Sequence, residues 1–336
     1  MSIVINRCIQ IKSLLQPLLL LLTLSGPPLH TQSLTFFLEN DVVARTDRHY
    51  THGCGFIWTS ATDSLNWKLK NTGAPIINLA KRLHPTAMYS SRSIALRQFA
   101  YTPQNIKTHT LLKNDQPYAG ATFLTARFSS KDALTVVTLA FDIGILGPDA
   151  GAAAMQKAVH RLIHSPAPQG WEHQLANELI LNLHLGQLRL WKQGLWHEQM
   201  HWRLSHFAQG HFGSLLTGGT GGLSFTLGPD PPALWGASPW QPGTVITCPT
   251  QKTVPSWLLF CKTEVNLVLR NAYLDGNLLH PSHRVKRKPL IVRLQLGFIT
   301  HWRGTVLAWH FTLEGRSFQT QRHAHRYGAV IITLPL

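Results

Sequence analysis

Hydrophobic and polar residues alternate along several segments of this chain. In residues 292–300, for example, Val292 and Leu296 fall on one face, and Arg293 and Gln295 fall on the other. Alternation with a period of two is typical of a β-strand whose two faces meet different environments. The segments with this character are 33–39, 135–143, 223–227, 265–269, 292–300, 305–313 and 327–334. Several approach about ten residues, the length that a tilted membrane-spanning strand needs.

The position of the tryptophans separates two folds that both produce alternation. A soluble β-sandwich would give the same pattern. In a transmembrane β-barrel, however, aromatic residues gather at the ends of the strands, where they form girdles at the membrane interfaces. Five tryptophans lie at or near predicted strand ends: Trp58, Trp196, Trp202, Trp302 and Trp309. The pattern therefore favours an all-β, antiparallel transmembrane β-barrel, with the sandwich as the alternative.

One segment departs from the β pattern. Residues 150–164 are rich in alanine and follow Pro148, and Pro166 comes directly after them. Met155 and Val159 recur at helical spacing and predict an apolar side that extends to residues 162–163. We therefore expect a short helix in a loop between two strands.

The first residues have the character of an export signal. Arg7 and Lys12 precede the apolar stretch Ser13–Leu24, and a polar, proline-containing segment follows. This stretch has the length of a signal peptide and is too short for a membrane-spanning helix. We predict a signal peptide over residues 1–32, cleaved near 29–33, and one barrel domain over residues 33–336.

The net charge limits the classes of partner that the protein is expected to bind. The chain has a net charge of +16, although only 14% of its residues are charged. A basic protein attracts polyanions, either nucleic acid or the phosphates of a bacterial surface. The export signal favours the phosphates, so we expect no nucleic-acid partner. The basic run 284–288 is then interpreted as a polar loop between strands.

Three cysteines remain after the predicted cleavage. Cys248 and Cys261 fall in what is predicted to be one irregular loop, and they could pair in an oxidising compartment. Cys54 would then be a small buried apolar residue. A mature chain without any disulfide is the alternative.

The predicted helix carries two histidines that are candidates for acid–base chemistry. Gln156, His160 and His164 recur at intervals of four and should share one stripe. An imidazole can take a proton from water near neutral pH. Because the chain has 19 histidines, any one of them can equally be a solvated surface residue, and we assign no role to His164.

A second candidate cluster is Glu39, Asn40 and Asp41, at the end of the first predicted strand. Their carboxylate and amide oxygens are the ligands that Ca²⁺ prefers, although an Asx-turn is the alternative. A hard cation can stabilise a developing oxyanion while a histidine activates water, which together hydrolyse an ester. A Gly-x-Ser-x-Gly motif does not occur in the sequence, so a serine-hydrolase elbow has no support.

Five landmarks, taken in order, resemble the family of outer-membrane lipid A deacylases, the LpxR-like 3′-O-deacylases. They span nearly the whole mature chain. The landmarks are Glu39-Asn40-Asp41 with 46–53, Tyr101-Thr102-Pro103, 114–120, the stretch from Gly147 through Gln156 and His160 to Glu178, and Asn271 with 274–277, Ser282-His283 and Lys288-Pro289. Two motifs depart from the family pattern: residues 49 and 52 are histidines where the family has tyrosine and asparagine, and residue 116 is glutamine where it has arginine.

The resemblance implies a barrel of about twelve strands in the bacterial outer membrane. It also implies a Ca²⁺-dependent site between the barrel wall and a loop helix, where the 3′-acyloxyacyl ester of lipid A is hydrolysed. On this basis Asn40 and Asp41 match the calcium and oxyanion region, with Glu39 as a further candidate ligand, and His160 matches the base.

Other landmark residues match the family without a firm role. Asp47, Arg48, Asp115 and Gln156 are candidates for substrate binding or for support of the site. The expected partners are lipid A, lipopolysaccharide and the outer-membrane lipids, bound by a monomer. The alternative function is a non-catalytic barrel, either a pore or a lipopolysaccharide-binding protein.

Overall fold

The computed structural model of the protein describes residues 32–41, 49–60, 63–64, 79, 82–197, 199–229 and 256–336. Residues 1–31 of the predicted signal peptide, Asp47, Arg48 and Cys248 lie outside these ranges. The strands are β1 (Ser33–Asn40), β2 (His49–Thr59), β3 (Asp63–Ser64), β4 (Tyr89–Thr102), β5 (Ala119–Lys131), β6 (Thr135–Leu146), β7 (Glu178–Trp196), β8 (Met200–Gly213), β9 (Leu216–Gly228), β10 (Ser256–Asn271), β11 (Leu290–Trp302), β12 (Thr305–Glu314) and β13 (His325–Pro335). The helices are η2 (Pro148–Ala150), α4 (Ala152–Leu162), η3 (Trp171–His173) and α5 (Ala272–Asp275).

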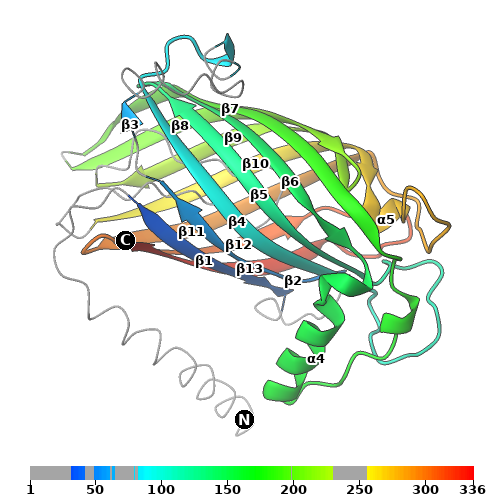
Figure 1. Ribbon diagram of the computed structural model, residues 1–336. Coiled ribbons are helices and arrows are strands. Elements are labelled where there is room, and N and C mark those ends of the chain that lie inside the picture. Colours follow the sequence, from blue (N-terminus) through cyan, green and yellow to red (C-terminus); the bar gives the residue numbers. More distant parts are fainter. Residues whose placement is uncertain are drawn as a thin grey trace, which may run out of the picture.

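Twelve long strands close into an antiparallel barrel (Figure 1). Consecutive long strands pair along the whole sheet, and β1 closes it by pairing with β13 on one side and β2 on the other. β2 pairs directly with β4, while the two-residue β3 pairs only with β4. Closure confirms the predicted barrel over the sandwich, because a closed sheet leaves no long edge strand unpaired.

The two faces of the wall differ as the alternation predicts. Outward-facing side chains are apolar and exposed along the middle of the strands, as Leu38, Phe56 and Leu96 show. In the segment 292–300, Val292 is exposed and Arg293 is buried in the lumen. Apolar side chains on the outside and polar ones on the inside are the arrangement of a barrel in lipid.

Charged side chains fill the lumen. Arg293 lies between Glu264 and Glu314, with nitrogen–oxygen distances of 2.6 and 2.5 Å. Glu264 also accepts a hydrogen bond from Lys262 at 2.7 Å. A buried charge is tolerated when it is paired in this way. The barrel interior is therefore a packed polar core at this level.

The two ends of the barrel carry different structures. Trp58, Trp196, Trp202 and Trp302 all lie at the end where β1 starts and β13 finishes. They match the predicted girdle at that end, whereas Trp309 lies in the middle of β12. α4, α5 and the described loops 103–118, 163–177 and 276–289 lie at the opposite end (Figure 1).

Two sequence predictions need correction. The predicted loop helix is present, but it ends at Leu162, and His164 has a left-handed backbone (φ 54°) beyond it. Cys261 lies within β10 instead of in an irregular loop; its partner in the predicted disulfide, Cys248, is outside the described residues. Within the described ranges, none of the helices has the length and apolarity required to cross a bilayer.

Candidate active site on the outer wall

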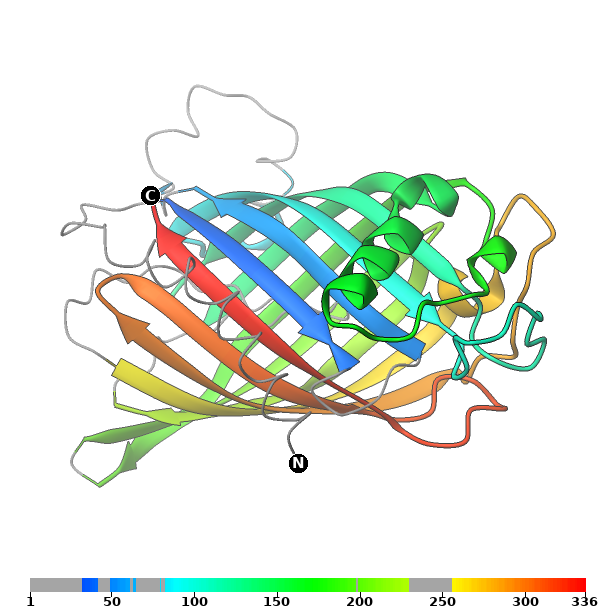
Figure 2. The same cartoon turned by 90° about the horizontal axis from the view of Figure 1, so that it is seen from below.

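α4 lies against the outside of the barrel, on β4 and β5 (Figure 2). It starts after Gly151, whose left-handed backbone (φ 73°) turns the chain from η2 into the helix. At the contact, a Cβ added to Gly120 of β5 would lie only 2.5 Å from the Cβ of Ala152. Glycine at position 120 therefore lets the helix approach the wall closely.

The wall beneath the helix is polar. Gln98 of β4 and Thr122 of β5 each donate a hydrogen bond to the backbone oxygen of Ala150, both at 2.7 Å. His52 of β2 lies 3.4 Å from Gln98, measured from Nε2 to Oε1. These three side chains occupy outward positions of their strands, where the rest of the wall carries apolar groups. The patch that α4 covers therefore offers polar groups for a reaction on an otherwise apolar surface.

His160 lies on the buried face of α4, in the last turn of the helix. Its Nδ1 atom lies 2.6 Å from the backbone oxygen of Pro166. A carbonyl oxygen only accepts hydrogen bonds, so Nδ1 must carry the proton. In the neutral ring, Nε2 then has the lone pair that a general base uses.

Gln156 lies on the same buried stripe of α4, one turn before His160. Its Oε1 accepts a hydrogen bond from the indole nitrogen of Trp171 at 2.7 Å. Trp171 in turn packs on Tyr118. This contact links α4 to η3, so Gln156 supports the helix that carries His160. His164, beyond the helix, is exposed and does not extend the stripe.

Asn40 and Asp41 lie at the top of β1, close to this patch. Asn40 is paired across the strands with His52, and the imidazole of His52 lies within electrostatic range of His160. By alternation Asn40 faces outward, as Leu38 does. Asp41, the next residue, is fully buried. The pairing of β1 with β2 therefore places Asn40 beside His52, one strand away from the wall that α4 contacts.

Glu39 lies on the other side of the wall. Its carboxylate accepts a hydrogen bond from the hydroxyl of Tyr50 at 2.5 Å and lies 3.7 Å from Nε2 of His310. Both partners are buried inside the barrel. The structure thus separates Glu39 from Asn40, and its place in the lumen gives no support to the predicted metal ligation.

Asp115 belongs to the loop 103–118 at the mouth of the barrel. Its carboxylate accepts a hydrogen bond from the backbone of Gln104 at 2.8 Å and lies 3.8 Å from His49. These two contacts hold the loop and the start of β2 together, so Asp115 has a supporting role. The other two landmark residues, Asp47 and Arg48, lie outside the described part of the chain.

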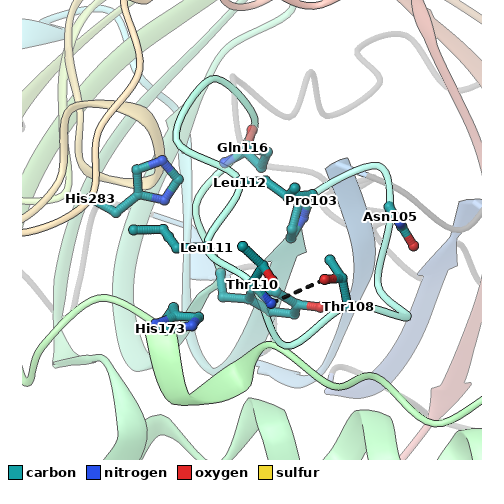
Figure 3. A pocket seen from close by; sticks show the side chains of 10 residues that line it. Pro103, Asn105, Thr108, Thr110, Leu111, Leu112, Gln116, His173 and His283 are labelled. Carbon is teal, nitrogen blue, oxygen red and sulfur yellow. Dashed lines mark hydrogen bonds between the residues drawn. The ribbon is translucent and has the colours of Figure 1, made fainter.

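The same loop borders a small pocket (Figure 3). Figure 3 shows Gln116, His173 and His283 around it, with the backbone nitrogen of Thr110 bonded to the hydroxyl of Thr108 at 3.0 Å. The pocket has a volume of about 10 Å³, which is room for about one water molecule. It is too small for an acyl chain, so the patch beneath α4 is the better candidate site.

The residues at the C-terminal end of β1 suit a hard cation better than a soft one. Asp41 and Asn40 offer carboxylate and amide oxygens, the ligand type of Ca²⁺. In the described ranges no group of three or more His, Cys, Asp or Glu side chains could hold a metal ion. A Ca²⁺ ion would therefore need further oxygens from the backbone, water or substrate, which is usual for this ion.

Sequence reasoning missed three residues of this patch: His52, Gln98 and Thr122. A signal for them does exist in the sequence. Each is a polar residue at an outward position of a strand whose other outward residues are mostly apolar, as Leu96 beside Gln98 illustrates. Such a position indicates that something other than lipid covers the wall.

A closed barrel with an apolar outer wall, a charge-filled lumen and a polar site beneath a loop helix defines an integral membrane barrel with its site on the outer surface. The family model "Outer membrane protein LpxR" matches residues 15–335. The chain belongs to this family of outer membrane proteins.

Solved structures agree with the fold. LpxR from Salmonella typhimurium superposes with a TM-score of 0.72 at 18% identity, covering 90% of this chain and 99% of that one. At this identity the likeness concerns the fold alone. The β domain of the Bordetella autotransporter BrkA gives a TM-score of 0.46 at 7% identity, covering 91% of this chain and 99% of that one, and carries no argument. A comparison with curated proteins finds no match.

Proposed function

We propose that this protein is an outer-membrane lipid A deacylase that hydrolyses the 3′-acyloxyacyl ester with a histidine-activated water, assisted by Ca²⁺. Membership of the LpxR family supports the substrate class. The observation that carries the mechanism is the orientation of His160, whose Nδ1 is hydrogen bonded to the carbonyl oxygen of Pro166, so that Nε2 carries the basic lone pair of the neutral ring.

In this mechanism Nε2 of His160 takes a proton from water as the water oxygen bonds to the ester carbonyl carbon. The bond from that carbon to the sugar oxygen then breaks. The protonated imidazole returns the proton to the sugar oxygen, so the products are a carboxylic acid and a free hydroxyl group. The hydrogen bond to the Pro166 carbonyl persists in both protonation states, because Nδ1 carries its proton throughout.

Asn40 and Asp41 are the residues that would hold Ca²⁺ near the reacting carbonyl. When bound, the ion would stabilise the negative charge that develops on the carbonyl oxygen. His52 and Gln98, on the wall below α4, would line the polar end of the site. The apolar wall beyond them would accommodate the acyl chains. We propose that the protein acts as a monomer, since one barrel and one helix supply all these residues.

The alternative of an open pore has no support from the lumen, where the buried Arg293 and Glu264 form an ion-paired cluster with the half-buried Glu314. A pore would conduct in a planar lipid bilayer, whereas we expect this barrel to show no stable conductance. A lipopolysaccharide-binding barrel without activity is separated from a deacylase only by assay.

The decisive experiment is mass spectrometry of lipid A from cells that produce the protein, with Ca²⁺ and with a chelator. We expect loss of the mass of one acyloxyacyl group, and we expect the chelator to prevent it. Unchanged lipid A in the presence of Ca²⁺, from a protein shown to be folded in the outer membrane, would refute the proposed activity.

A further inference from the structure

The burial of α4 is the reverse of an ordinary surface helix. Its polar residues Gln156 and His160 are buried against the barrel. Its large apolar residues are exposed: Met155 by 43%, Val159 by 39% and Leu162 by 56%. An amphipathic helix on a protein in water places its apolar stripe against the core instead. The exposed stripe therefore needs a different partner.

The exposed residues form two separate stripes. Met155, Val159 and Leu162 are spaced by four and three residues, so they lie in one row along the helix. Lys157 and Arg161 are both exposed and form a second row. With about 100° of rotation per residue, the apolar row lies roughly 90° to one side of the buried stripe and the basic row about 120° to the other side.

The wall beside the helix shows what the apolar row meets. α4 rests on β4 and β5 (Figure 2). The outward side chains of these strands include Ile94, Leu96 and Leu124, which are all exposed. In a membrane barrel such residues contact lipid. A helix lying at this wall with one apolar and one basic side has the design of an interfacial helix, which contacts acyl chains and headgroup phosphates together.

We propose that α4 is a membrane-interface helix. The row Met155, Val159 and Leu162 contacts the acyl chains of the outer leaflet, and Lys157 and Arg161 face the phosphate layer. The buried stripe with His160 is then held at the boundary between acyl chains and headgroups. The proposal rests on the membrane barrel and not on the deacylase activity, although it would explain how a lipid ester reaches His160 without leaving the leaflet.

The test places an environment-sensitive fluorophore at single cysteines in the mature chain, with the native cysteines replaced by alanine. Met155→Cys and Val159→Cys report the apolar row, and Lys157→Cys on the same helix is the matched control. The protein is reconstituted in vesicles of phosphatidylcholine and phosphatidylglycerol. Quenching is measured with doxyl-labelled acyl chains and with iodide present on both sides of the membrane. Heat-modifiable mobility in gels verifies that each barrel is folded.

We expect doxyl lipids to quench the probes at residues 155 and 159 about threefold more than the probe at 157, and iodide to give the opposite order. If one apolar-row variant fails to fold, the other provides the result. Equal iodide access at all three positions would overturn the proposal. Protection of residues 155 and 159 from both quenchers would also overturn it, because a protein partner would then cover the row. Lipid quenching here, together with unchanged lipid A in cells that produce the folded wild-type protein, would refute the deacylase activity and leave the interface helix in place.

Discussion

The Nδ1 atom of His160 lies 2.6 Å from the carbonyl oxygen of Pro166, six residues further along the chain. This contact joins the last turn of α4 to the segment that leaves it. The imidazole is thus oriented by a main-chain carbonyl and not by a carboxylate. Its tautomer is set by the acceptor, because a carbonyl cannot donate. The lone pair of the neutral imidazole is therefore on Nε2.

Replacing His160 by glutamine should reduce lipid A deacylation by about 10²- to 10⁴-fold, the usual contribution of a general base. The barrel should still fold, because His160 lies on the outer wall and not in the lumen. Mass spectrometry of lipid A measures the loss. The matched control is His164→Gln, at an exposed position just beyond the same helix. Equal activity in the two variants would remove His160 from the mechanism.

The opposite orientations of Asn40 and Glu39 allow a test of the calcium site. Asn40→Ala should lower the activity and raise the Ca²⁺ concentration needed for half of it, since an oxygen ligand is lost. Glu39→Gln should leave the Ca²⁺ requirement unchanged, because this carboxylate is bonded to Tyr50 in the lumen. Deacylation is measured over a calcium titration. A shifted Ca²⁺ requirement in Glu39→Gln would place this residue in the site after all.

The close approach of Gly120 to Ala152 predicts that the helix position is sensitive to one methyl group. Gly120→Ala would place a Cβ 2.5 Å from that of Ala152, so α4 must move away from the wall. We expect activity to fall about ten- to a hundredfold through misplacement of His160. Gly210→Ala is the control, because a Cβ there meets no atom within 4 Å. The deacylation rate of folded protein is compared for the two variants, and equal rates would contradict the predicted coupling.

Arg293 should be important for stability and not for chemistry. Its removal in Arg293→Leu leaves the buried Glu264 and the half-buried Glu314 without this cation. Breaking a buried ion pair in this way costs about 3–5 kcal/mol, so the midpoint of urea unfolding in lipid vesicles should fall clearly. Arg316→Leu, at an exposed position, should leave the midpoint nearly unchanged. A wild-type midpoint in the first variant would show that the cluster adds no stability.

The turn between β5 and β6 gives a pH-dependent contribution. Burial raises the pKa of Asp132, but hydrogen bonds from Thr86 and from the backbone of Leu134 and Thr135 outweigh this and hold the pKa well below its usual range. The pKa of Asp132 is lower in the folded protein than in the unfolded chain, where it is about 4. The carboxylate therefore stabilises the fold fully above about pH 4. This stabilisation is lost as the pH falls towards the pKa of the folded state.

Asp132→Asn should therefore be less stable than the wild type at pH 7, and the difference should shrink as the pH is lowered below about 4. Unfolding midpoints of the two proteins, measured at pH 7 and at a pH below about 4, give this difference in stability. Asp149→Asn, an exposed change at the opposite end of the barrel, is the control. A difference that is constant across the range would contradict the assigned charge effect.

The fold could be predicted from the sequence to a large extent. Alternation in segments such as 292–300 specifies which residues face lipid and which face the lumen, because the side-chain period of a strand is two. The same logic located the loop helix, since alanine-rich sequence between prolines cannot continue a strand pattern. Histidine at position 160 and the oxygen-rich end of β1 were also visible as candidates for chemistry.

Only the tertiary structure decided how these pieces meet. Alternation places Glu39 and Asn40 on opposite faces, but it could not tell which face is the lumen and which lies beside α4, because that depends on how the sheet closes. The helix pattern predicted an apolar side with Met155 and Val159, but the structure buries Gln156 and His160 instead. The reason is physical: periodicity reports which residues share a face, whereas the partner of that face, protein or lipid, is determined by the packing of distant segments.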